Sequence, residues 1–271
     1  MKKLMFAAVA VLGLSAFAAI ESSNIVGYQG LQANATRQTM IAPTFLGVGN
    51  AEGCTLADLK VTGYEAPELV DDEWEGGCGG GDFILQFLNP NGTIAARYYW
   101  VDDGDVGPGW FATGGGVAIA GGAESVEINA GMALWVKGSG MKLQAAGAVN
   151  KADVEYVTNS SRQTAVGNAT PVTLTLGDLA VAGYEEPELV DDEWEGGCGG
   201  GDFILQFLNP NGTVAARYYW VDDGDVGPGW FATGGGVAID GGAESVEIPA
   251  GKGLWVKGSG MTLVIPAPAG L

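Results

Sequence analysis

A long segment of this chain occurs twice, and the repeat limits the folds that the chain can adopt. Residues 67–119 match residues 187–239 at every position except Ile94, which is replaced by Val214. The offset is 120 residues, and a looser match extends the repeat towards the end of each copy. Two units of this length are too few and too long for a solenoid. The repeat therefore predicts two tandem domains of similar fold.

The two copies differ in length near their start. The motif Asn-x-x-Arg-Gln-Thr occurs at residues 34–39 and again at residues 159–164, which is an offset of 125. The first copy therefore carries five extra residues between Thr39 and Thr55. We expect the first domain to span residues 20–146 and the second to span residues 147–271.

The first 19 residues have the pattern of a secretory signal peptide. Lys2 and Lys3 precede an apolar run, Leu4–Leu14, which is short for a bilayer span, and Ala-Phe-Ala at 16–18 forms a small-x-small cleavage motif. We expect residues 1–19 to be removed on export, with a retained N-terminal anchor as the alternative. The protein is then secreted, either extracellular or held at the cell surface.

The chain is strongly acidic. It has 12 Lys and Arg residues and 32 Asp and Glu residues, so loss of Lys2 and Lys3 with the signal peptide gives a net charge of 10 − 32 = −22. Such a charge repels nucleic acids and anionic lipids, and it attracts cations. We therefore expect no nucleic-acid partner and no membrane insertion after signal cleavage.

Each copy is predicted to be built from β-strands. Residues 83–88 and 93–101 are rich in branched and aromatic side chains, and the Asn-Gly turn between them at residues 91 and 92 predicts a hairpin. Segments 133–137 and 141–146 flank a Gly-Ser-Gly turn, which indicates a second hairpin. The predicted fold class is all-β, with each copy a β-sandwich or a partly closed barrel.

Helix signals are confined to one short motif in each copy. Thr55 and Asp58 have the spacing of a capping box, and the equivalent segment of the second copy begins at Thr175. No sustained 3.6-residue period follows either motif, so we expect a single capped turn at each place.

The strand at 93–101 carries large aromatic residues on both faces. Strand alternation places Tyr99 and Val101 on one face, and Tyr98 and Trp100 on the other. One face is expected to pack the core, while the other covers a second element, the sister domain or a ligand.

One motif near the end of each copy resembles a known class of proteins. Ile-x-x-Gly-x-x-x-Trp-Val occurs at residues 128–136 and 248–256, and Ser-Ser-Asn-Ile-Val-Gly-Tyr-Gln at residues 22–29 follows the signal peptide. Both are similar to segments of secreted bacterial β-repeat proteins of unknown function. The resemblance implies secretion and a β-rich repeat fold, and it implies no particular activity.

Several chemistries are excluded by composition. The chain has no histidine, which rules out Ser-His-Asp and Cys-His catalysis and histidine-containing zinc or haem sites. Its three cysteines are too few for a four-thiolate site within one chain. The glycine-rich segment 76–81 lacks the following helix that a phosphate-binding loop needs.

Calcium suits the acidic segments better than any other cofactor, because hard cations prefer clustered oxygen ligands. The segment Asp-Asp-Gly-Asp-Val-Gly follows the strand at 93–101, and the predicted hairpin returns the chain to the aspartate that precedes residue 83. A purely solvated turn is the alternative. The candidate metal ligands are Asp82, Asp102, Asp103 and Asp105, with Asp202, Asp222, Asp223 and Asp225 in the second copy.

The tryptophans near these acids allow a second interpretation. Trp100 and Trp110, with Trp220 and Trp230 in the second copy, are candidate platforms on which sugar rings would stack. The alternative is that they fill the core. Paired carboxylates would also permit glycoside hydrolysis, but the same residues in both copies fit duplicate binding or structural modules better than duplicate active sites.

The cysteines leave three arrangements open. A Cys54–Cys78 disulfide would staple the first copy and leave Cys198 available for a bond between chains. A Cys78–Cys198 bond would require the copies to face each other about a pseudo-twofold axis. In the third arrangement all three thiols are free.

These observations predict a structural or interaction protein of the secreted or cell-surface kind, such as an adhesin-like protein or a matrix or filament subunit, rather than an enzyme. Its expected partners are other copies of itself or a surface polysaccharide. Residues 24–29 are apolar enough to add a strand to their own domain or to a neighbour's sheet edge. A calcium-assisted carbohydrate-binding module is the main alternative.

Overall fold

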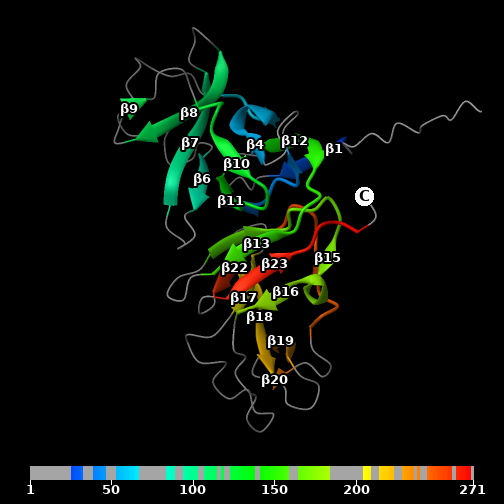
Figure 1. The fold of residues 1–271 in the computed structure, drawn as a ribbon. Coiled ribbons are helices and arrows are strands. Elements are labelled where there is room, and N and C mark those ends of the chain that lie inside the picture. The colour runs from blue at the N-terminus through cyan, green and yellow to red at the C-terminus, as the bar shows by residue number, and fades with distance from the viewer. Residues whose placement is uncertain are drawn as a thin grey trace, which may run out of the picture.

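The structure is a computed structural model, drawn in Figure 1. Over the residues that it describes, the chain consists almost entirely of β-strands, which confirms the predicted all-β class. These residues are 26–32, 39–46, 53–66, 84–88, 94–102, 107–114, 117–118, 123–137, 141–158, 164–183, 204–208, 214–222, 228–234, 237–238, 243–257 and 261–269.

The described strands of the first copy form three sheets. Its elements are β1 (Val26–Gln32), β2 (Thr39–Ile41), β3 (Phe45–Leu46), β4 (Gly53–Thr55), η1 (Leu56–Asp58), β5 (Leu59–Thr62), β6 (Ile84–Leu88), β7 (Ile94–Asp102), β8 (Pro108–Gly114), β9 (Val117–Ala118), β10 (Glu127–Asn129), β11 (Leu134–Lys137) and β12 (Lys142–Val149). One sheet has the order β2-β11-β6-β7-β8-β9, and a second places β12 between β1 and both β3 and β5. Strands β10 and β4 form the third sheet.

The second copy repeats this plan. Its elements are β13 (Val154–Val157), β14 (Thr164–Gly167), β15 (Leu174–Thr175), η2 (Leu176–Asp178), β16 (Ala180–Ala182), β17 (Ile204–Leu208), β18 (Val214–Asp222), β19 (Pro228–Gly234), β20 (Val237–Ala238), β21 (Glu247–Ile248), β22 (Gly253–Lys257) and β23 (Thr262–Ile265). The sheet orders are β14-β22-β17-β18-β19-β20, β13-β23-β16 and β15-β21. Among the described strands, β3 has no counterpart here, and it lies in the segment where the first copy is longer.

The first predicted hairpin is confirmed and the second is wrong. Strands β6 and β7 pair antiparallel, with a register shift between Phe87 and Leu88 next to the turn. Strand β11, by contrast, pairs with β2 and β6, whereas β12 pairs with β1, β3 and β5. The chain therefore crosses from one sheet to another between β11 and β12, and β22 and β23 do the same in the second copy.

The predicted capped turns are present. Asp58 accepts hydrogen bonds from the Thr55 backbone N–H at 2.7 Å and from the Thr55 hydroxyl at 3.0 Å. Asp178 and Thr175 repeat the arrangement at 2.7 and 2.9 Å. Both turns are 3-10 turns of three residues. No helix in the described part of the chain is long and apolar enough to cross a membrane.

Residues 24–29 were predicted to add a strand to their own domain or to a neighbour. The described part of this segment belongs to β1, which pairs antiparallel with β12 along its whole length, from Val26 opposite Ala148 to Gln32 opposite Lys142. The segment therefore completes a sheet of its own copy.

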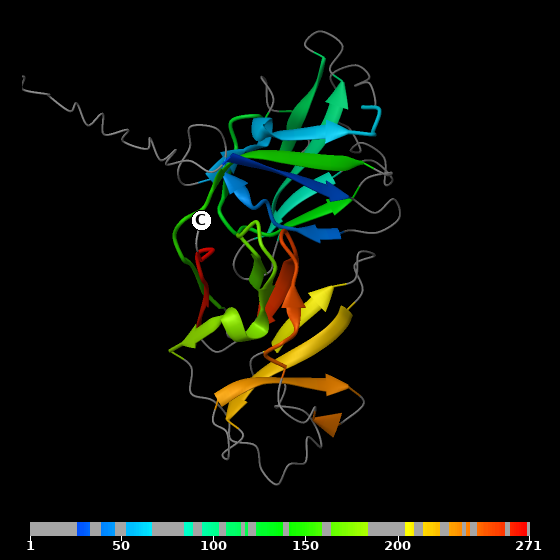
Figure 2. The ribbon, with the colours of Figure 1, turned by 90° about the vertical axis from the view of Figure 1, so that its right-hand side faces the viewer.

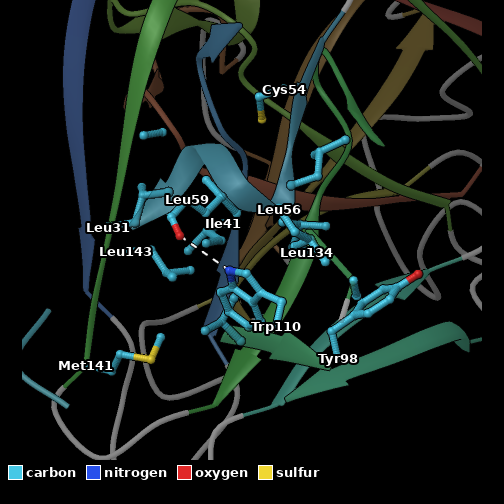
Figure 3. Packing of buried hydrophobic residues seen from close by; sticks show 14 of the residues in the cluster. Leu31, Ile41, Cys54, Leu56, Leu59, Tyr98, Trp110, Leu134, Met141 and Leu143 are labelled. Carbon is cyan, nitrogen blue, oxygen red and sulfur yellow. Dashed lines mark hydrogen bonds between the residues drawn. The ribbon is translucent and has the colours of Figure 1, made fainter. Parts of the chain in front are cut away.

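The main hydrophobic cluster of the first copy joins residues of two sheets. Leu134 of β11 comes from one sheet and Leu143 of β12 from the other, and both are essentially unexposed. Trp110 of β8 lies among them, below the η1 turn that carries Leu56 (Figure 3). The second copy has an equivalent cluster that includes Trp230, Leu254 and Leu263.

A short turn joins the two copies. Strand β12 continues to Val149, so the predicted boundary between residues 146 and 147 falls inside a strand. The Asn150 side chain then accepts a hydrogen bond from the Ala152 backbone N–H at 3.1 Å and donates one to the Ala152 carbonyl at 2.9 Å. In two views at right angles, β8 and β9 lie at one end of the molecule and β19 and β20 lie at the other (Figures 1 and 2).

Candidate functional site

The candidate site is the hairpin formed by β7 and β8, together with its equivalent in the second copy, formed by β18 and β19. We call these the aromatic hairpins. In the first, Trp100 lies opposite Trp110, and Asp102 lies opposite Pro108 at the end of the pairing. The second copy has the same register at equivalent positions. The two hairpins therefore present the same residues in the same order.

Two of the four predicted stacking platforms are buried in the core. Trp110 and Trp230 have no exposed surface, so neither indole has a face to offer a sugar ring, and this corrects their prediction as ligand-binding residues. The physical reason is their position on β8 and β19, on the side of the sheet that faces the hydrophobic clusters. Trp100 and Trp220 pack against the same clusters but stay partly exposed.

Each buried tryptophan contacts its partly exposed neighbour edge to face. The Trp100 and Trp110 ring centroids lie 5.2 Å apart at an interplanar angle of 68°, and Trp220 and Trp230 lie 5.2 Å apart at 67°. This geometry is favourable for aromatic pairs. Since the buried ring fixes the other, Trp100 and Trp220 are held in equivalent orientations.

A glutamate that sequence reasoning missed fastens each hairpin. Glu124 Oε1 accepts a hydrogen bond from the Trp110 backbone N–H at 3.2 Å, and Glu244 does the same for Trp230 at 3.0 Å. A Cβ at Gly109 would lie 2.6 Å from Glu124 Oε1, so an alanine at this position would require the carboxylate to move. The one signal in the sequence was the repeated Ala-Glu-Ser-Val-Glu segment, whose first glutamate lies fourteen residues after the tryptophan in both copies.

The indole of Trp110 is fixed as well. Its Nε1–H points at the Leu59 carbonyl oxygen at 3.4 Å, which ties β8 to the strand that follows the η1 turn (Figure 3). The aromatic hairpin, which belongs to the six-stranded sheet, is thus also anchored to the sheet that contains β5 and β12. A site built on it is held rigidly by the core.

Both faces of β7 carry buried aromatic residues. Tyr98 packs into the cluster around Trp110, and Tyr99 and Val101, which point the other way, are also buried. Burial raises the pKa of Tyr98 and of its equivalent Tyr218 above the ordinary value. These tyrosines therefore stay protonated in the folded protein and act as packing residues.

The predicted metal ligands fall mostly outside the described residues. Asp102 ends β7 with a partly exposed side chain, and Asp222 ends β18. The register pairs Ile84 with Tyr99, which brings the start of β6 alongside the end of β7. Within the described residues no three His, Cys, Asp or Glu side chains gather as a metal site. Outside the described residues lie Asp82, Asp103, Asp105, Asp202, Asp223 and Asp225.

Cys54 is buried in the core of the first copy, and among the described residues it forms no disulfide. Burial, reinforced by the nearby Asp58 carboxylate, raises the pKa of this thiol from 9.0 to about 12. Its predicted partner Cys78 lies outside the described residues, as does Cys198. The Cys54–Cys78 disulfide and a bond between chains through Cys198 stay predictions.

Comparisons with known proteins give no relative for this chain. No family model matches it. No curated protein and no solved structure matches it either. The function has to be argued from the geometry of the molecule and the chemistry of its residues.

Proposed function

We propose that the protein is a secreted or cell-surface structural protein, adhesin-like or matrix-forming, which links partners through two equivalent ends. One observation carries the proposal: the aromatic hairpins have the same residues and register, and the β8–β9 region of the first copy and the β19–β20 region of the second lie at opposite ends of the molecule (Figures 1 and 2). Whatever one end binds, the other end binds by the same chemistry. A protein with two such ends can hold two partners together.

Bivalence gives such a linker its strength. A second binding event that follows the first is intramolecular, so two weak contacts give a much tighter overall attachment. The partners we propose are further copies of this protein or a surface polysaccharide that repeats the same chemical unit. No catalytic step is part of the proposal, in keeping with a sequence that has no histidine.

We propose that cations, calcium above all, bind at the acidic end of each aromatic hairpin. Support comes from Asp102 and Asp222, which end β7 and β18 and continue directly into further aspartates in the sequence. A net charge of 10 − 32 = −22 would keep two such molecules apart. Cations bound at the β7–β8 and β18–β19 turns would lower the net charge of each molecule and so reduce the repulsion between two copies.

The architecture we propose is two tandem β-sandwich domains after a cleaved signal peptide. In each copy, the largest hydrophobic cluster draws side chains from the six-stranded sheet and from the sheet that contains β12 or β23. In a β-sandwich, two sheets pack face to face and share one hydrophobic core. The crossing from β11 to β12 supports this proposal, since it carries the chain from one layer to the other.

A carbohydrate-binding module is a second candidate, and the partly exposed Trp100 and Trp220 favour it. They sit at equivalent positions of the two copies and are oriented by the buried tryptophans beside them. A glycan array read with intrinsic tryptophan fluorescence tests this candidate. Binding that disappears in the Trp100→Ala and Trp220→Ala double variant would support it, and silence across polysaccharides would remove it.

The linking role is tested by measuring the size of the mature protein with calcium and with a chelator. We expect its mass to increase with protein concentration in calcium and to fall in chelator. If a surface polysaccharide is the partner instead, calcium alone leaves a monomer and added polysaccharide cross-links it. A monomer under all of these conditions contradicts the proposal.

A further inference from the structure

The two copies meet about a pseudo-twofold axis. Ile41 of the first copy forms a β-bridge with Lys252 of the second, and Met132 of the first copy forms one with Val166 of the second. Ile41 and Val166 are equivalent, because they pair with the equivalent residues of β11 and β22. Met132 and Lys252 are equivalent by the 120-residue offset. The same two positions therefore meet twice, as in an isologous dimer interface.

The interface is packed and apolar around this axis. Trp135 and Trp255, which occupy equivalent positions, have ring centroids 6.0 Å apart at an interplanar angle of 46°. A backbone hydrogen bond of 2.9 Å runs from the Ala42 N–H to the Gly251 carbonyl, directly between the copies. The cluster at the axis consists of Met40, Ala133, Trp135, Ala165 and Trp255.

Side-chain size differs between the copies where they touch. Ala42 of the first copy faces its own equivalent, Gly167, and a Cβ at Gly167 would contact the Ala42 Cβ and lie 3.4 Å from its Cα. Met40 of the first copy covers Gly253, and a Cβ there would contact the Met40 side chain and lie 3.0 Å from its carbonyl carbon. In each pair, the first copy supplies the larger side chain and the second supplies the space for it.

Neither glycine is needed for its backbone conformation. Both lie on strands, Gly167 on β14 and Gly253 on β22, and neither is among the glycines with positive φ. An alanine at either place would have an ordinary backbone. The absence of a side chain at these two positions is explained by the neighbouring copy.

At a third contact the second copy supplies the larger side chain, and the glycine that it faces, Gly131, has a positive φ of 75° and is also a glycine, Gly251, in the second copy. The Cβ position of Gly131 in the first copy points at the Tyr156 hydroxyl of the second and lies 3.2 Å from the Val154 Cγ1. Tyr156 corresponds to Leu31 of the first copy, because each pairs with the equivalent leucine of β23 or β12. The larger ring reaches across the interface from the second copy only.

We propose that the two copies have become complementary in size at this interface, so that the first copy recognises the second and neither recognises itself. Two first copies would bring two Ala42 methyl groups into one space and would place Met40 over Ala133, which carries the Cβ that Gly253 lacks. Two second copies would leave gaps at Gly167 and opposite Gly253, where Ala165 replaces Met40. Any exchange between chains would therefore pair a first copy with a second copy, which is specificity by exclusion of the wrong partner.

The test moves one methyl group across the axis in the full chain. Gly167→Ala places two methyl groups in the space of one, and we expect it to lower Tm by at least about 3 °C. Ala42→Gly combined with Gly167→Ala keeps one methyl group and is expected to recover most of the loss. Gly30→Ala is the control, because it lies on a strand with nothing within 4 Å of its Cβ position.

A second pair of variants tests the contact between Met40 and Gly253 independently of the contact between Ala42 and Gly167. Gly253→Ala is expected to lower Tm, and Met40→Ala combined with Gly253→Ala is expected to lower it by less than the sum of the two single changes. Such coupling is expected where the two positions are in contact, whereas distant independent positions are additive. If Gly167→Ala and Gly253→Ala are as harmless as Gly30→Ala, or if both pairs of changes are additive, the proposal is overturned.

Discussion

Trp135 of the first copy and Trp255 of the second lie across the pseudo-twofold axis with ring centroids 6.0 Å apart. Rings this close couple their electronic transitions, so they contribute a paired signal to the circular dichroism spectrum. We predict that Trp135→Phe and Trp255→Phe remove the same component, and that the double variant removes no more of it. Different difference spectra for the two single variants would contradict the contact.

A second prediction concerns the buried thiol. Because burial raises the pKa of Cys54 from 9.0 to about 12, the reduced native protein holds this group as an unreactive thiol at pH 8. We expect Cys54 to react with a thiol reagent much more slowly in the native protein than in urea. The Cys78→Ser and Cys198→Ser double variant isolates its signal. Equal rates in the two states would show that Cys54 is not buried.

The raised pKa also predicts how stability depends on pH. The unfolded thiol loses its proton above about pH 9, whereas the folded thiol keeps it up to about pH 12. The contribution of the protonated Cys54 thiol to the free energy of unfolding is therefore fully present below pH 9 and is lost as the pH rises towards 12. In the reduced protein, Cys54→Ala is expected to flatten this part of the stability profile relative to Cys198→Ala. Parallel profiles would contradict the assignment.

The capped turns give a matched pair of stability predictions. Asp58→Ala removes the acceptor for both the backbone N–H and the hydroxyl of Thr55, and Asp178→Ala does the same to Thr175. We expect each change to lower the free energy of unfolding by about 1 kcal/mol. Urea denaturation measures it, and Asp58→Asn is the control that keeps an acceptor oxygen. If neither alanine variant lowers the free energy of unfolding by more than the experimental error, the caps do not contribute to stability.

The glutamates that fasten the aromatic hairpins provide another prediction. Glu124→Ala leaves the Trp110 backbone N–H without its carboxylate acceptor, and we expect a loss of about 1–2 kcal/mol in the free energy of unfolding. Glu124→Gln keeps an acceptor and should retain most of the stability. The same changes at Glu244 should have the same effect. If the glutamine and alanine variants are equally destabilised, the hydrogen bond is not the cause.

Local signals in the sequence predicted the local structure well. The Asn-Gly turn and the branched strands around it led to the β6–β7 hairpin, and the spacing of Thr55 and Asp58 led to the capped turn. The Gly-Ser-Gly segment led to a wrong hairpin between residues 133–137 and 141–146. A turn between two strands has the same composition whether the strands pair with each other or belong to different sheets. The pairing of β11 with β2 and of β12 with β1 depends on residues that are far away in the sequence, such as Ile41 opposite Leu134 and Gln32 opposite Lys142.

The site and the interface were harder to predict for a different reason. The sequence around Trp100 and Trp110 does not indicate which of the two side chains is exposed. The register of the β7–β8 hairpin and the position of the η1 turn decide that Trp110 is the buried one. The interface between the copies depends on residues such as Met40 and Gly253, where the repeat has diverged. The residues of the aromatic hairpins are nearly identical in the two copies. The residues that make the interface complementary in size are those that differ between the copies.

The most direct test of the linking role is sedimentation equilibrium of the mature protein in calcium, with one or both ends altered. One variant neutralises Asp102, Asp103 and Asp105 to asparagine, a second neutralises the equivalent aspartates 222, 223 and 225, and a third combines both sets. The account predicts that the unaltered protein forms species larger than a dimer, that either single-end variant stops at a dimer, and that the combined variant stays monomeric. If all four proteins have the same mass distribution, the two hairpin ends do not link this protein to its neighbours.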